Sequence, residues 1–148
     1  MRIALGADHA GVHLKQDIRR LLDDRGIAYT DFGTNATDSV DYPDFAAQVG
    51  TEVASGHFDY GILFCGSGVG MAIAANKVDG IRAAAVIDVE SARLSREHNN
   101  ANVLALGERL TPADQARQIV NTFIDTPFAG GRHQRRVDKI AALEHPHT

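Results

Sequence analysis

A single cysteine, Cys65, stands directly before a glycine-rich segment, Gly66 to Gly70, which leads into an apolar stretch of helical character. A thiol at a helix N-terminus is favoured as the reactive thiolate, because that end of a helix carries partial positive charge. Successive backbone N–H groups in a glycine turn can also bind an oxyanion. A base beside an oxyanion site is the equipment needed to remove a proton next to a carbonyl group.

Three other functions of a glycine-rich turn are excluded by the neighbouring residues or by the position of the turn in the chain. A nucleotide-binding P-loop ends in Gly-Lys-Ser/Thr, but Gly70 precedes Met71 and Ala72. A dinucleotide-binding loop follows the first strand of its fold, whereas this one follows the third expected strand. A cysteine phosphatase loop would need arginine where Met71 stands. A structural alternative stays open, in which Cys65 is a small buried apolar residue and the glycines only permit a tight turn.

Further polar side chains suit a phosphorylated ligand. His9 follows the first apolar run, and Arg132 and Arg136 stand one helical turn apart, where they could clamp a phosphate. Neighbouring basic residues of the same segment are expected to be solvated. His98 ends a predicted helix, where it could simply be a favourable C-terminal cation. These residues indicate an anionic ligand without fixing its identity.

No group of residues has the ligand count of a metal site. His9 and His13 are four residues apart, but no third ligand is evident. His145 and His147 are expected to belong to a disordered tail, and one cysteine cannot form an internal disulfide. We therefore expect no metal site.

Strand-type and helix-type patterns alternate along the chain, which predicts a parallel sheet covered by helices on both faces. Five such units indicate a doubly wound, three-layer α/β sandwich of Rossmann type with strand order 2-1-3-4-5. Ligands of such folds bind beyond the carboxyl ends of the strands, between strands 1 and 3, where Asp8, His9 and Cys65 should meet. The expected strands are 2–6, 27–32, 60–64, 82–87 and 103–107; the expected helices are 14–25, 42–55, 71–77, 89–97 after Asp88 as N-cap, and one with Thr111 as N-cap and Pro112 at its first position.

Composition sets the class of the protein. The chain has 148 residues, of which 44% are hydrophobic and 23% charged, as in ordinary globular domains. We expect a single domain, 1–148, in which 130–148 forms a basic helix and a frayed end after a Gly-Gly hinge. The net charge of −4 argues against nucleic-acid binding, and the apolar runs are too short for a membrane span. The N-terminus does not resemble a signal peptide, so a cytoplasmic location is expected.

Five segments, in order, resemble type B ribose-5-phosphate isomerases, whose fold is shared by galactose-6-phosphate isomerase subunits. They span nearly the whole chain, and five motifs in one order make the resemblance specific. The segments are GADHAG (6–11), DYPDFA (41–46), CGSGVGMAIAANK (65–77), SREHNNANVLALGER (95–109) and GGRHQRRVDKI (130–140).

The resemblance implies an aldose–ketose isomerase that works through an enediolate, with no metal and no organic cofactor. Cys65 matches the base that moves the proton between the first two sugar carbons, and Met71 stands where another branch of the family has a glutamate. His98 matches the residue that opens the furanose ring. The other implied substrate contacts are Asp8 at the sugar end, the loop residues Gly66, Ser67, Gly68, Val69 and Gly70 with Asn99 at the enediolate oxygen, and His9, Arg109, Arg132 and Arg136 at the phosphate and sugar.

The expected fold separates the two implied catalytic residues. Cys65 ends the third strand, whereas His98 ends a helix that has returned to the opposite edge of the sheet. A five-residue strand is roughly 17 Å long, while proton transfer needs about 3 Å or one bridging water. If both residues serve one site, His98 must come from a partner subunit. We therefore expect a homodimer, or a dimer of dimers, with active sites shared between subunits.

Two classes of function remain open at this point. The first is the isomerase, acting on ribose 5-phosphate or on another aldose phosphate such as allose 6-phosphate, galactose 6-phosphate or a four-carbon sugar phosphate. The second is a non-catalytic module that binds a sugar phosphate on the same fold, since fold alone does not determine function. Cys65 discriminates between them, because a binding module needs the glycines and arginines but has no use for a thiolate.

Overall fold

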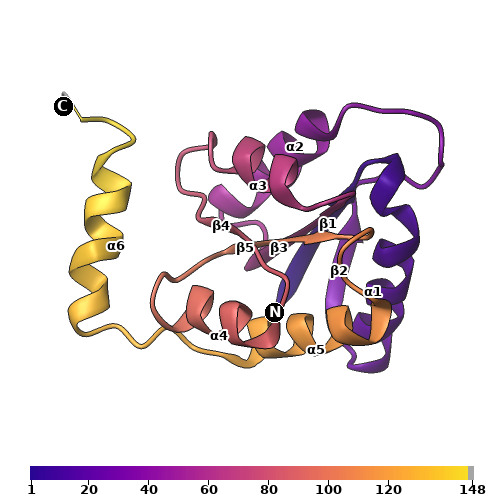
Figure 1. Ribbon diagram of the computed structural model, residues 1–148. Coiled ribbons are helices and arrows are strands. Elements are labelled where there is room, and N and C mark those ends of the chain that lie inside the picture. The colour runs from indigo at the N-terminus through magenta and orange to yellow at the C-terminus, as the bar shows by residue number, and fades with distance from the viewer. Residues whose placement is uncertain (147–148) are drawn as a thin grey trace.

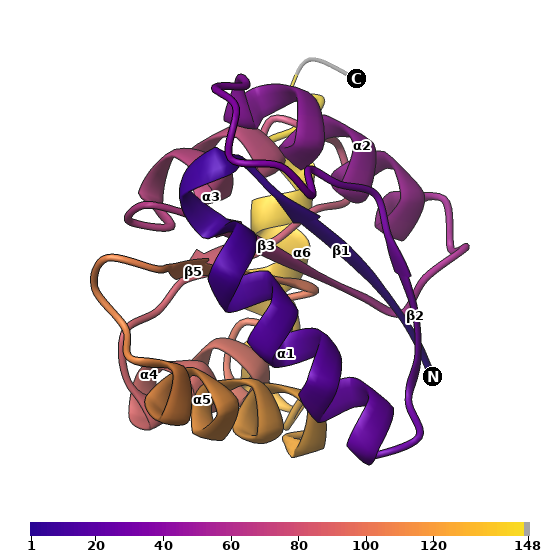
Figure 2. The ribbon, with the colours of Figure 1, turned by 90° about the vertical axis from the view of Figure 1, so that its right-hand side faces the viewer.

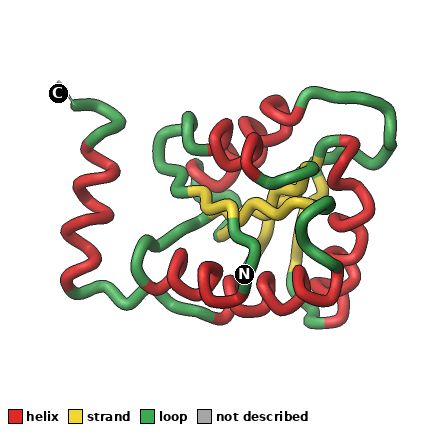
Figure 3. Tube along the Cα trace, viewed as in Figure 1, coloured by secondary structure: helices red, strands yellow, loops and turns green. Residues whose placement is uncertain are grey.

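The structure is a computed structural model that describes residues 1–146. It is the expected α/β sandwich: helices cover both faces of a central parallel sheet (Figures 1 and 3). The strands are β1 (Arg2–Ala7), β2 (Ala28–Asp31), β3 (Tyr60–Cys65), β4 (Ala83–Ala85) and β5 (Val103–Gly107); the helices are the short 3-10 helix η1 (His9–Gly11), α1 (Val12–Asp24), α2 (Tyr42–Ala54), α3 (Val69–Ala75), α4 (Val89–Glu97), α5 (Ala113–Asp125) and α6 (Arg132–Ala142).

Two apolar cores lie on the two faces of the sheet. Helices α1, α4 and α5 cover one face, where Leu14, Ile18 and Leu22 of α1 are buried at spacings of four residues. Helices α2 and α3 cover the other face (Figures 1 and 2). The strand β3, YGILFC, contributes to both cores, which explains its almost unbroken apolar sequence.

The strand order is β2-β1-β3-β5-β4, so the expected order 2-1-3-4-5 is wrong at one edge. The physical reason lies in the two strands that exchange places. All five residues of β5 are buried, whereas β4 is three alanines that are only partly covered. The more apolar strand takes the interior position beside β3, and the short one takes the edge. This exchange brings the loop after β5 directly beside the loop after β3.

The edge strand β4 is protected by a side chain. The amide of Asn76 accepts a hydrogen bond from the N–H of Ala83 at 2.7 Å and donates one to its carbonyl at 2.9 Å. An unpaired strand edge invites pairing with another chain. Asn76 therefore satisfies the outward backbone groups at the start of β4.

Some element boundaries differ from the expected ones by one or two residues. Helix α3 begins at Val69, two residues before the expected start, and β4 is shorter than the expected strand. Pro112, not Thr111, is the N-cap of α5, because the Pro112 carbonyl accepts the first helical bond, from Ala116. The N–H of Thr111 bonds instead to Gly107 in the turn after β5. Asp88 is the N-cap of α4, as expected, and accepts a hydrogen bond from the N–H of Ser91.

Helix α6 stands apart from the sandwich (Figure 1). Only Val137 of this helix is buried, and Gly130 and Gly131 before it both have positive φ, as a Gly-Gly hinge allows. His145 is not in a disordered tail, because its Nε2 lies 2.8 Å from a carboxylate oxygen of Asp79. His147 lies outside the described residues. Across residues 1–146, none of the helices is long and apolar enough to cross a bilayer.

Candidate active site

A crevice of about 540 Å³ lies at the carboxyl ends of β1, β3 and β5. The strand register places Ala7 beside Phe64 and Cys65 beside Gly107, so the three loops that follow these strands open at one edge. Eight of the expected site residues meet there, together with four that were not expected. The crevice is lined by Asp8, His9, Ala10, Tyr42, Cys65, Gly66, Ser67, Val69, Gly70, Ile73, Arg109 and Leu110.

The sulfur of Cys65 is held by the glycine loop. The N–H of Gly68 donates to Sγ at 3.1 Å, and the thiol is only 5% exposed. This hydrogen bond fixes the orientation of the sulfur at the wall of the crevice. Gly68 has φ +82°, and a Cβ there would lie 3.1 Å from the backbone of Leu106, so only glycine suits this position. Cys65 is both a buried residue of the core and a residue of the crevice wall.

The loop offers fewer oxyanion donors than its five N–H groups suggest. The Gly68 N–H is occupied by Sγ, and the Val69 N–H donates to the Ser67 hydroxyl oxygen at 3.2 Å. The Ser67 hydroxyl therefore orders its own loop. Glycine is required at position 70 for a steric reason, because a Cβ there would lie 2.6 Å from the ring of Tyr42.

Asp8 and His9 are fixed on the other wall. Asp8 caps the short helix η1 by accepting a hydrogen bond from the N–H of Ala10, and it is nearly buried. The Nδ1 atom of His9 accepts a hydrogen bond from the N–H of Val40 at 3.2 Å. An imidazole that accepts at Nδ1 carries its proton on Nε2. His9 can therefore donate from Nε2 to an anionic ligand.

Arg109 belongs to the crevice of its own chain. Its N–H donates to the Gly66 carbonyl at 3.0 Å, and its guanidinium lies over Gly66, where a Cβ would come within 3.1 Å of Nη1. The exchanged order of β4 and β5 causes this closeness, since β4 would otherwise separate the two loops. The sequence alone did not decide which subunit supplies Arg109 to a site.

Two residues that support the site carry no recognisable sequence signal. Glu108 accepts a hydrogen bond from the N–H of Leu14 at 2.7 Å and so caps α1 from a distant loop. Lys15 is fully buried and donates to Asp31 at the end of β2 and to Thr34 and Asn35 beyond it. Burial lowers the pKa of Lys15, while its hydrogen bond to Asp31 acts in the opposite direction.

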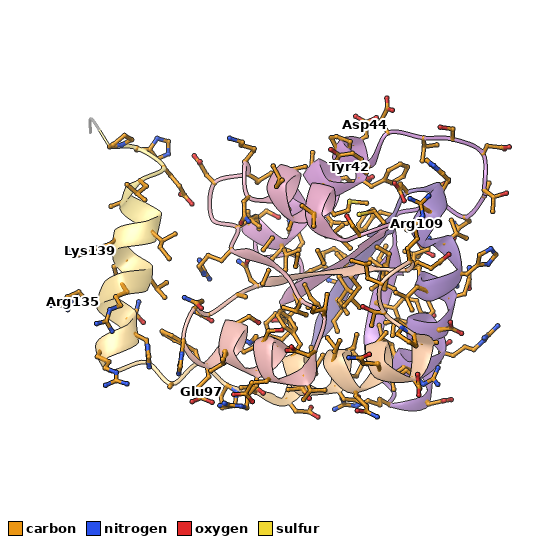
Figure 4. All side chains as sticks on the ribbon, in the orientation of Figure 1. Tyr42, Asp44, Glu97, Arg109, Arg135 and Lys139 are labelled. Carbon is orange, nitrogen blue, oxygen red and sulfur yellow. The ribbon has the colours of Figure 1, made fainter. Side chains whose placement is uncertain are left out.

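Of the other five expected residues, Gly68 belongs to the loop at the crevice and four lie elsewhere. His98 is the C-cap of α4, and its ring stacks on that of His133 at a centroid distance of 4.3 Å. The pKa of His133 is lowered by desolvation first, and then by His98, Arg132 and Arg136. Glu97, the neighbour of His98, and Arg109 lie at opposite ends of the domain (Figure 4). Arg132 and Arg136 are exposed on α6.

Asn99 lines a second cavity, which we call the α6 groove. It has a volume of about 730 Å³ and lies between α6 and the edge strand β4. Helix α6 is attached on both sides of it, by the carbonyl of Glu97 that accepts from Ala129 and by Glu144 that accepts from the N–H of Gly80. The groove is lined by Asn76, Lys77, Asp79, Ile81, Arg82, Ala83, Ala84, Ser95, Asn99, Ala101, Ile140, Leu143 and Glu144.

Residues 1–146 contain no group of three or more His, Cys, Asp or Glu side chains arranged to hold a metal ion. The crevice instead combines a thiol, two polar residues after β1 and an arginine. It can hold an anion at Arg109 and His9, with the Cys65 thiol in the same crevice.

The chain was compared with known proteins and solved structures. Residues 3–140 match the model of the ribose/galactose isomerase family. Ribose-5-phosphate isomerase B of Escherichia coli is 48% identical over 143 residues, which cover 97% of this chain and 96% of that one. The structure of Clostridium thermocellum ribose-5-phosphate isomerase B superposes with a TM-score of 0.98 at 51% identity and covers all of both chains. That of Mycoplasma genitalium ribose-5-phosphate isomerase B with bound ribulose-5-phosphate has a TM-score of 0.94 at 44% identity, covering 99% and 97%.

Proposed function

The chain belongs to the ribose/galactose isomerase family, and from this premise we propose that it interconverts ribose 5-phosphate and ribulose 5-phosphate through an enediolate. The observation that carries the proposal is Cys65, whose Sγ accepts the Gly68 N–H at the wall of a crevice that also holds Arg109. A non-catalytic binding module has no need of a thiol at this place. Purified protein should convert ribose 5-phosphate to the ketose faster than it converts a six-carbon aldose phosphate. If the protein converted none of the aldose phosphates tested, the proposal would be overturned.

The reaction needs one proton to move between two carbons. The Cys65 thiolate removes the proton from C2 of the open-chain aldose, and the electron pair forms the C1–C2 double bond of the enediolate. The proton of the C2 hydroxyl passes to the oxygen on C1, and the thiol returns its proton to C1. Donors of the loop after β3 stabilise the developing negative charge on oxygen, with Asn99 of a partner subunit assisting. Asp8 holds the sugar end of the substrate.

The phosphate is bound by cations and by a neutral histidine. Arg109 lies in the crevice and is always charged, and His9 donates from Nε2. Arg132 and Arg136 complete the phosphate contact from α6 of a partner subunit. His98 of the same partner opens the furanose ring of the sugar before proton transfer.

Two exposed apolar surfaces support a dimer with shared sites. Val69 and Ile73 of α3 and Leu110 at the crevice rim are each more than half exposed, although a sugar phosphate has little use for apolar contacts there. The α6 groove of the same chain has an apolar wall that includes Ile140 and Leu143. In the proposed dimer, the apolar surface formed by Val69, Ile73 and Leu110 of one subunit lies in the α6 groove of the other. This arrangement brings Asn99 and His98 to the partner's crevice.

Arg132→Ala and Arg136→Ala should each weaken substrate binding more than turnover. Each variant loses a charge-assisted contact of about 1.5–3 kcal/mol, which corresponds to a rise in KM of roughly 10- to 100-fold. Initial-rate kinetics and inhibition by inorganic phosphate measure the effect.

Arg135→Ala is the matched control for these variants. Arg135 is a neighbouring cation on α6 and lies with Lys139 on the side that faces away from the domain (Figure 4). It should leave KM and phosphate inhibition unchanged. Equal phosphate inhibition in wild type, Arg132→Ala and Arg136→Ala would contradict the proposal that these two arginines bind the substrate phosphate.

Chelators should not affect turnover. Backbone N–H groups and arginines stabilise the enediolate and the phosphate in the proposed mechanism, so no divalent ion is required. Activity is measured before and after prolonged dialysis against EDTA. A loss that added Mg²⁺ or Zn²⁺ restores would refute the metal-free mechanism.

A further inference from the structure

Arg96 of α4 is a buried cation without a carboxylate partner. Its residue is only 5% exposed, and its Cζ lies 4.8 Å from the ring centroid of Tyr60 and 5.7 Å from that of Phe123. In the part of the chain that the structure describes, no acidic side chain forms an ion pair with it. Desolvation lowers the pKa of Arg96, and the positive charge of Arg82 acts in the same direction. A buried charge is tolerated only where its hydrogen bonds are satisfied.

The N–H groups of Arg96 bind the turn that follows its own helix. Nη1 donates to Asn100 Oδ1 at 2.9 Å and to the carbonyl of Ala101 at 2.6 Å, and Nε donates to the carbonyl of Thr126 at 3.2 Å. Charge-assisted hydrogen bonds of this kind are the stronger ones. Arg96 therefore ties the end of α4 to the chain just beyond it and to the segment that leads to α6.

Asn100 is the centre of this turn. It has φ +49°, the only positive φ of a non-glycine residue in the described chain. Such a backbone conformation persists where the surroundings hold it. A second arginine, Arg82, donates from Nε to the Asn100 carbonyl at 2.8 Å, and the Asn100 N–H donates to the carbonyl of Arg96 at 3.1 Å. Two arginines thus hold both the side chain and the backbone of Asn100.

His98 and Asn99 are the two residues between the helix and this clamped turn. Neither side chain takes part in the hydrogen bonds of the turn; the His98 side chain is 39% exposed, and Asn99 lines the α6 groove. The Arg96 and Arg82 hydrogen bonds therefore fix the backbone that carries His98 without occupying the His98 side chain. We infer that Arg96, together with Arg82, is a positioning residue that aims His98 at the crevice of a partner subunit. The inference rests on the proposed function, in which His98 opens the sugar ring.

The test compares the two directions of the reaction. Ribose 5-phosphate is mostly a furanose and needs its ring opened, whereas ribulose 5-phosphate stays open because its O5 carries the phosphate. A variant that misplaces His98 should therefore slow the forward reaction and spare the reverse one. Both rates are measured at enzyme concentrations high enough that spontaneous ring opening in solution limits the variant. Below that range the overall equilibrium constant ties the forward and reverse values of kcat/KM together, whereas in it the reverse reaction can release open-chain aldose that closes in solution.

Arg96→Met is the first variant. It removes the N–H donors but keeps an apolar chain between Tyr60 and Phe123, and replacement of a buried ionic group by an apolar one is often compatible with a stable fold. The initial rate with ribose 5-phosphate should fall roughly 10-fold or more, since small misplacements of a catalytic group have large effects. The rate with ribulose 5-phosphate should change by less than about twofold. Arg20→Met, which replaces an exposed arginine of α1, is the control and should alter neither rate.

The double variant with His98→Ala adds a readout that a merely structural role would not produce. Adding Arg96→Met to His98→Ala should lower the forward rate no further, because residues that act through one another are not additive. If Arg96→Met does not fold, Arg96→Lys replaces it: one ammonium cannot reach all three acceptors, so the forward rate should fall by a smaller factor with the reverse rate unchanged. Equal losses of rate in both directions, or no loss in either, would overturn the positioning role of Arg96 while leaving the proposed isomerase activity intact. A wild-type protein inactive with both sugar phosphates would instead overturn the proposed function.

Discussion

Cys65→Ala is expected to bind sugar phosphate like the wild type and to lose nearly all turnover. The replaced thiol is the proposed base, and a positioned general base contributes about 10²- to 10⁴-fold to rate. The N–H of Gly68 donates to Sγ, so the sulfur is oriented before substrate arrives. Initial rates with ribose 5-phosphate measure the loss. Exchange of the substrate C2 proton with deuterated solvent, followed by NMR, measures the proton-abstraction step by itself.

Two controls separate loss of a base from loss of the crevice. Inhibitory binding of inorganic phosphate and the midpoint of thermal unfolding should stay close to the wild-type values. Within residues 1–146 the Cys65 sulfur bonds to the Gly68 N–H and not to Arg109 or His9, and alanine fills most of the same space. Cys65→Ser keeps the volume but replaces the thiol with a much weaker acid, and it should be nearly as slow. An alanine variant that isomerises ribose 5-phosphate within a few-fold of wild type would exclude Cys65 as the base.

Most of the fold follows from patterns along the chain, and the exception is the order of β4 and β5 in the sheet. The apolar runs and their alternation with helical periods predict all five strands and the layers that cover them. The order of β4 and β5 depends on which strand is buried on both faces. The apolar sequence VLALG of β5 is fully buried, whereas the three alanines of β4 are only partly covered. That comparison, not periodicity, decides which strand is at the edge.

The crevice was predictable in outline because it lies at the carboxyl ends of parallel strands. Asp8, His9 and the loop after β3 meet as expected, and the resemblance to the family is confirmed by the match over residues 3–140. Glu108 could not be predicted, because it caps α1 across 94 residues of sequence. Tyr42 was identified only as the start of a helix, and its packing against Gly70 depends on how α2 and α3 approach each other.

The distance between Cys65 and His98 leads to the prediction that subunits share their sites. Cys65 is at the carboxyl end of β3, beside Gly107, whereas the turn after His98 leads to Asn102, which bonds to Gly61 at the start of β3. Four residues of strand separate Gly61 from Cys65, about 13 Å at the usual rise per residue. His98 of one chain is thus at the wrong end of the sheet for Cys65 of the same chain.

Mixing two inactive variants should restore activity. In a mixed dimer of Cys65→Ala and His98→Ala subunits, one site receives both wild-type residues and the other receives neither. Random exchange between equal amounts makes about half of the dimers mixed, so about a quarter of wild-type activity should return if the two sites of a symmetric dimer act independently. The recovery is measured with ribose 5-phosphate as substrate after exchange at low protein concentration. Differently tagged subunits verify that mixed dimers have formed.

A mixture of Arg96→Met with each of these variants extends the same logic. If Arg96 positions His98, its variant belongs to the His98 group: it should recover activity with Cys65→Ala and should not recover it with His98→Ala. Sites made from a single chain predict no recovery in any mixture, because every site would then lack one residue that its own chain has lost. Verified exchange without recovery in the Cys65→Ala and His98→Ala mixture would therefore refute the shared site, whatever the oligomeric state of the protein.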